Sequence, residues 1–186
     1  PEVVHSTLRK DDQFVEVTLD AAPDDWHLTI VGATDHAPEE ANLVRERVLQ
    51  SGLRRNITIA GVVSARELSR LYVHADLFVM PSLYEGFCMP VLEAMTCGTA
   101  VACSNVSSLP EVVGDAALTF DPHDVRDMAQ VIARAISDKA LRAECVARGA
   151  SRAAPFTWQA CAQRVMAVLE GVAGAGHEAG PTNVSS

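Results

Sequence analysis

The residues best suited to chemistry lie in the segment from Glu85 to Glu93, which reads Glu-Gly-Phe-Cys-Met-Pro-Val-Leu-Glu. Its first carboxylate stands in a predicted loop, and its second stands one turn into a predicted helix. Carboxylates accept hydrogen bonds from paired hydroxyls, such as a ribose cis-diol or a hexose edge, and each charged bond contributes about 1.5–3 kcal/mol. On spacing alone, a solvated loop residue and a helix-surface residue remain the simpler interpretation.

The residues between the two glutamates favour an anion as a further ligand. Gly86 offers backbone without a side chain, and the amides of Phe87, Cys88 and Met89 lead into a helix predicted to begin near Pro90. Several N–H groups can therefore point at one phosphate. A catalytic thiol is one interpretation of Cys88, but we favour a small side chain in a crowded loop.

The elements that must position this segment follow from the pattern of apolar residues. Short apolar runs without alternation predict strands covered on both faces, at residues 27–31, 56–60, 76–80, 99–103 and 117–120. Helical segments between and after them are predicted at residues 38–51, 64–75, 90–96, 124–137, 139–149 and 157–171. The fold class is α/β, a Rossmann-like three-layer α/β/α parallel sheet.

The start of the chain is predicted to hold the central strand of that sheet. Residues 2–5 would form a short first strand, which we expect to be truncated, and residues 11–20 a helix. In a doubly wound sheet of order 3-2-1-4-5-6, ligands bind beyond the carboxyl ends of strands one and four. This geometry brings Arg9 or Lys10 close to the loop that carries Glu85.

A long part of the chain resembles the retaining GT-B glycosyltransferases of family 4. The likeness is clearest at residues 81–101, which include the E-x7-E pair, continues through residues 104–117, and covers roughly residues 26–169. It implies the C-terminal half of a GT-B fold, which binds a nucleoside-diphosphate sugar. It also implies an N-terminal acceptor-binding domain or partner chain.

The resemblance assigns roles residue by residue. Glu85 would be catalytic and contact the donor hexose, while Phe87, Cys88, Met89 and Pro90, together with Gly86, would surround the sugar and diphosphate. Glu93 would hold the ribose hydroxyls. The loop that contains Gly61 and Val62 would line the base.

The resemblance also implies an Arg and a Lys five residues apart, which neutralise the departing diphosphate. Lys10 matches as a catalytic residue, but His5 stands where the Arg is expected, and Arg9 is adjacent to Lys10. A neutral His would supply less charge to the leaving group. The other interpretation is that the alignment is shifted by a few residues here.

Composition bounds the remaining possibilities. With 186 residues and 48% hydrophobic residues, we predict one domain over residues 1–171 and a disordered tail over residues 172–186. The net charge of -9 argues against a nucleic-acid partner.

The five cysteines form no CxxC pair, so neither a disulfide framework nor a metal site is expected. The sequence shows no transmembrane segment or signal peptide, so we expect a cytoplasmic protein, with peripheral binding to the inner membrane face as an option.

The function expected from the resemblance is hexosyl transfer from a UDP- or GDP-sugar to a hydroxyl, with retention and without a metal or other cofactor. Mannosyl transfer is the first candidate. The alternative is a nucleotide-sugar-binding module without independent activity. A dinucleotide-dependent oxidoreductase shares the architecture, but residues 5–12 contain no glycine for its phosphate-binding turn.

Overall fold

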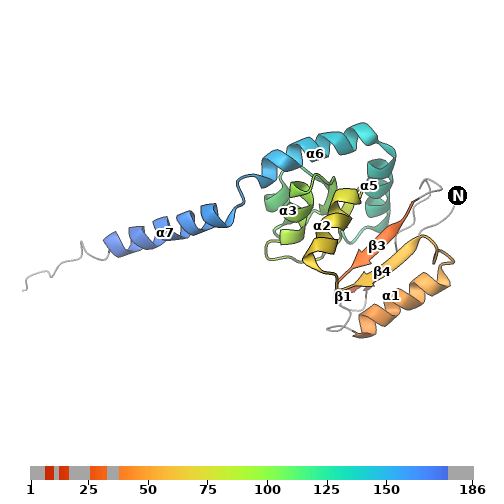
Figure 1. The fold of residues 1–186 in the computed structure, drawn as a ribbon. Helices are drawn as coiled ribbons and strands as arrows, with labels where there is room; N and C mark the ends of the chain where they lie inside the picture. The colour runs from red at the N-terminus through yellow and green to blue at the C-terminus, as the bar shows by residue number, and fades with distance from the viewer. Residues whose placement is uncertain (1–6, 11–12, 17–25, 33–37, 176–186) are drawn as a thin grey trace, which may run out of the picture. The chain divides into compact units, whose positions relative to one another are not determined.

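The computed structural model describes residues 7–10, 13–16, 26–32 and 38–175. The chain divides into two units at the junction of Ala153 and Ala154. The first unit contains the sheets and helices α1 to α6, and the second contains α7 (Trp158–Ala175) (Figure 1). Helix α7 continues past Gly171, where the sequence predicted its end, because one glycine costs a helix only about 1 kcal/mol. The single domain ending at residue 171 stays a prediction.

Two groups of parallel strands form two of the sheets in the first unit. Strand β3 (Leu28–Val31) pairs with β4 (Ile57–Gly61), and β5 (Phe78–Met80), β6 (Val101–Ser104) and β7 (Leu118–Phe120) pair in that order. These pairings are the two halves of the predicted order 3-2-1-4-5-6. The strand predicted for its middle position, residues 2–5, lies outside the described residues.

The segment after it differs from the prediction. Strand β1 (Thr7–Lys10) pairs antiparallel with β2 (Gln13–Glu16), with Lys10 opposite Gln13, so the helix predicted over residues 11–20 is wrong for residues 13–16. Phe14 and Val15 favour extended backbone, and the hairpin supplies β2 with a partner close in sequence. Pairing with a strand so close in sequence therefore outweighs the spacing of apolar residues in 11–20 that favoured a helix.

The predicted helices form close to their expected bounds. They are α1 (Pro38–Gln50), α2 (Ala65–His74), α3 (Met89–Thr96), α5 (Val125–Ser137) and α6 (Lys139–Ala153). The short helix α4 (Leu109–Val113) was not predicted. A capping box begins α2: the Glu67 amide donates to Ser64 Oγ at 3.3 Å, and the Ser64 amide donates to Glu67 Oε2 at 3.1 Å.

Strand β6 is covered on both faces, as its unbroken apolar run predicted. All four of its residues are buried. Val101 and Cys103 face a core cluster built around α3 and α4, whereas Ala102 faces a second cluster with Phe120 and Ile57. Because the second cluster takes residues from β4, β6 and β7, the two parallel sheets share it. This confirms the α/β class with helices on both sides of parallel strands.

Helix α3 is anchored by close packing against α6. In Figure 1 the two helices lie near each other, and they are in contact. A Cβ added at Gly149 of α6 would stand 3.2 Å from Cγ of Met95, a residue of α3 that is only 2% exposed. The absence of a side chain at Gly149 therefore lets the helices approach. Helix α3 also contacts α2, so the helix that carries part of the candidate site is held by packing against two other helices.

Candidate functional site

The loop that carries Glu85 leaves the sheet at the expected edge. Strand β5 ends at Met80 and pairs in parallel with β6, which ends at Ser104. The connections that follow the two strands, residues 81–88 and 105–108, therefore start at the same carboxyl edge. Ligands bind beyond this edge in open α/β sheets.

Glu85 is held by serine hydroxyls from both connections. Ser82 donates to its carboxylate oxygen Oε1 at 2.8 Å. Ser107 donates to its carbonyl oxygen at 2.7 Å and accepts from its amide at 3.3 Å, and Ser108 donates to the same carbonyl at 2.9 Å. The side chain is half-buried. Sequence reasoning missed these serines, although all three stand inside the stretch that carries the family resemblance.

The connection ends in a left-handed residue that starts α3. Cys88 has φ 70° and ψ 69°, and its side chain is 5% exposed. Helix α3 begins one residue earlier than predicted, at Met89, with Pro90 in its first turn. Phe87 and Met89 on either side of Cys88 are exposed. The turn thus buries the thiol and exposes its neighbours.

Burial, with smaller contributions from the charges of Glu85 and Glu93, raises the pKa of the Cys88 thiol to about 11. The thiol is therefore protonated at neutral pH and is a poor nucleophile. Glu85 precedes this buried turn and Glu93 stands on the helix that follows it, so the two ends of the E-x7-E pair are carried by the loop and the helix on either side of Cys88.

Glu93 stands on α3 with an exposed side chain. The hydroxyl of Tyr72, from α2, donates to Glu93 Oε2 at 3.4 Å. Burial, followed by the charge of Glu93, raises the pKa of Tyr72, so this hydroxyl keeps its proton. Tyr72 is a second residue that sequence reasoning missed, because nothing in its local pattern separates it from a core aromatic.

The remaining predicted residues occupy two other places. Gly61 ends β4 with φ +66°, and Val62 after it is 71% exposed, so both lie on the carboxyl side of a parallel strand. Arg9 and Lys10 belong to β1 of the antiparallel hairpin. The strand predicted before them, residues 2–5, lies outside the described residues, so their approach to Glu85 stays a prediction.

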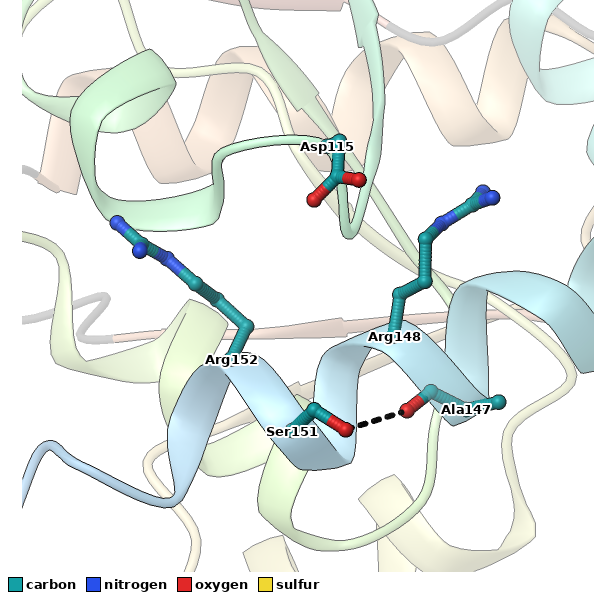
Figure 2. Close-up of a pocket in the computed structure, with 5 residues that line it drawn as sticks. All are labelled: Asp115, Ala147, Arg148, Ser151 and Arg152. Carbon is teal, nitrogen blue, oxygen red and sulfur yellow. Dashed lines mark hydrogen bonds between the residues drawn. The ribbon is translucent and has the colours of Figure 1, made fainter.

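A surface depression of about 500 Å³ lies away from these residues, lined by Asp115, Ala147, Arg148, Ser151 and Arg152 (Figure 2). None of the predicted site residues lines it. Arg152 donates through Nε to the carbonyl of Val112 at 2.8 Å, and Arg148 pairs with Glu144 at 3.7 Å. These arginines thus make contacts that tie α6 to α4 and to its own preceding turn.

Two classes of site find no support in the described ranges. Among these residues, no group of three or more His, Cys, Asp or Glu side chains could hold a metal ion. In the same part of the chain, no helix is long and apolar enough to cross a membrane.

The parallel strands and the helices on both faces define a Rossmann-like α/β domain. The chain belongs to the family Glycosyl transferases group 1, whose sequence pattern matches residues 12–152.

Relatives in sequence are longer than this chain. O-antigen chain mannosyltransferase B of Escherichia coli is 46% identical over 116 residues, which cover 62% of this chain and 30% of the relative. Mannosylfructose-phosphate synthase of Agrobacterium fabrum is 33% identical over 150 residues, which cover 78% of this chain and 33% of the relative. The chain thus spans about a third of these relatives.

Solved structures support the fold. Sucrose-phosphate synthase from Thermosynechococcus elongatus has a TM-score of 0.71 at 28% identity, over 80% of this chain and 39% of its own. The Anabaena protein Alr3699/HepE in complex with UDP has a TM-score of 0.73 at 20% identity, over 81% of this chain and 42% of its own. Both likenesses confirm the predicted α/β class.

Proposed function

We propose that the chain is the donor-binding part of a retaining glycosyltransferase of family 4, which moves a hexose from a UDP- or GDP-sugar to a hydroxyl. The observation that carries this proposal is the placement of Glu85 on the loop and Glu93 on the helix that follow β5 at the carboxyl edge of the sheet, in a chain of this family. Mannose is the first candidate for the hexose, because a relative that is 46% identical is a mannosyltransferase.

The arrangement suits a donor with a sugar at one end and a ribose at the other. The carboxylate of Glu85, fixed by Ser82, would accept from hexose hydroxyls, and that of Glu93, backed by Tyr72, would accept from the ribose. The amides at the start of α3 point toward the diphosphate in this arrangement. Gly61 and Val62 would lie against the base.

Catalysis in such a site consists of positioning and of stabilising charge on the leaving diphosphate. The bond between the anomeric carbon and the diphosphate oxygen breaks, the acceptor oxygen bonds to that carbon on the same face, and the proton of the acceptor hydroxyl passes to the departing diphosphate. Lys10 and the amides at the start of α3 would stabilise the departing anion. Glu85 positions the sugar and forms no covalent bond in this proposal.

The two carboxylates provide the direct test. Isothermal titration of the chain with UDP, GDP and their hexose derivatives, GDP-mannose among them, should find one base preferred. Glu93→Ala should weaken binding about tenfold, because it removes a charged acceptor. Glu46→Ala, which changes an exposed glutamate of α1, is the matched control. Unchanged affinity in a folded Glu93→Ala chain would overturn the site.

The alternative is a donor-binding module that needs a partner for turnover, and it is favoured by the extra length of the relatives. An N-terminal acceptor-binding domain or partner chain would then complete the enzyme. Transfer to an acceptor by this chain alone would eliminate the alternative. The anomeric configuration of the product, read by NMR, tests retention.

A further inference from the structure

Backbone strain is concentrated around Glu85. Among the described residues, the non-glycine residues with positive φ are Cys88, at φ 70°, and Ser107, at φ 58°. A left-handed conformation costs a residue with a side chain about 1–2 kcal/mol. One of these residues ends the loop that carries Glu85, and the other contacts Glu85 from the neighbouring connection.

Ser107 contacts both polar groups of one residue's backbone. Its hydroxyl donates to the Glu85 carbonyl at 2.7 Å and accepts from the Glu85 amide at 3.3 Å, so one short side chain fixes the peptide groups on both sides of the Glu85 Cα. Ser108 donates to the same carbonyl at 2.9 Å. A carbonyl oxygen has two lone pairs, so both bonds form together.

These contacts determine where the carboxylate of Glu85 can be. The loop has no helix or strand of its own between β5 and α3 to set its path, and its backbone is tied to a neighbouring loop instead. The side chain then projects from a fixed Cα, and Ser82 sets its terminal oxygen. The strain at Ser107 persists because the left-handed backbone brings the hydroxyl to Glu85.

We infer that Ser107, assisted by Ser108, is a positioning residue that sets Glu85 for recognition of the donor's hexose. This inference rests on the proposed function. Because Glu85 contacts the sugar in that proposal while Glu93 contacts the ribose, Ser107 governs the sugar-dependent part of affinity. The nucleoside-diphosphate part depends on groups that Ser107 does not contact.

Glycine is the informative replacement. Ser107→Gly removes the hydroxyl but accepts a positive φ without strain, so the relieved strain should offset much of the cost of the lost hydrogen bonds and of the freer unfolded chain, and the chain should still fold. Ser107→Asn restores a donor and an acceptor in a residue that tolerates the left-handed region, and it serves as the rescue variant. The control is Ser137→Ala, which removes a hydroxyl that donates to the carbonyl of Ala133 at 2.9 Å at the end of α5.

The measurement compares affinities for a nucleoside diphosphate and for its sugar derivative, using GDP with GDP-mannose and UDP with UDP-glucose. Ser107→Gly should weaken binding of the sugar derivative roughly three- to tenfold, the effect of about one hydrogen bond, and leave the diphosphate within about twofold. Ser107→Asn should recover part of the loss. In a Glu85→Ala background, Ser107→Gly should have no further effect on the sugar-dependent part.

The outcomes separate the two proposals. If the unaltered chain binds no nucleotide sugar, the proposed function fails and this inference fails with it. If the unaltered chain binds and Ser107→Gly binds equally well, only the inference is overturned. Equal weakening for diphosphate and sugar derivative also overturns it, because Ser107 would then support the loop as a whole.

Discussion

The loop that carries Glu85 and the helix that carries Glu93 are held in place by different forces. The loop is tied by hydroxyl groups of Ser82, Ser107 and Ser108, and it ends in left-handed backbone. The helix is held by apolar packing, with Met95 set against Gly149. Directional bonds place a loop group accurately at small net free energy, whereas apolar burial supplies most of the stability. Changes in the two regions should therefore separate binding from folding.

The largest expected effect is on stability, from a change in the packing between α3 and α6. Met95→Ala should lower the free energy of unfolding by about 2–5 kcal/mol, because it leaves a cavity between α3 and α6. Denaturant unfolding followed by circular dichroism measures this. Leu49→Ala, at a position of α1 that is 55% exposed, is the control and should change stability little. A small loss of unfolding free energy in Met95→Ala would mean that packing against α6 is not what holds α3.

A smaller effect is expected at Tyr72, which belongs to both regions. Its ring packs edge-on against Phe78, with centroids 5.3 Å apart, while its hydroxyl reaches Glu93. Tyr72→Phe should keep the packing, change the free energy of unfolding by about 1 kcal/mol or less, and weaken nucleotide-sugar binding by less than Glu93→Ala does. Melting and titration of the same sample measure both. A loss of stability in Tyr72→Phe as large as that in Met95→Ala would contradict the separation of binding from folding.

The smallest effect is chemical and concerns Cys88, where the two regions meet. Burial raises the pKa of this thiol to about 11, so its reactive thiolate is scarce below about pH 10 and increases only as pH rises. Native iodoacetamide labelling at pH 8, read by mass spectrometry, should modify the exposed Cys161 and spare Cys88. The denatured chain is the control, in which both are labelled. Equal labelling rates in the native chain would show that the turn does not bury Cys88.

Much of the architecture could be predicted from local pattern. The five parallel strands, the capping box of α2 and the turn that leads into α3 follow from apolar runs and from Ser64 and Pro90. The antiparallel pairing of β1 with β2 could not, because strand pairing between neighbours in the chain overrode an apolar spacing that suited a helix. The place predicted for Arg9 and Lys10 depends on a strand at residues 2–5, outside the described residues, and stays a prediction.

The sequence by itself determined the fold class, the family and the two carboxylates, because apolar periodicity and an extended motif are properties of consecutive residues. Only the tertiary structure decided what holds those carboxylates. Ser107 lies 22 positions from Glu85 in the chain, and Tyr72 lies 21 from Glu93, so neither pairing leaves a local signal. They become neighbours because parallel strands release their connections at one edge and because α2 packs against α3.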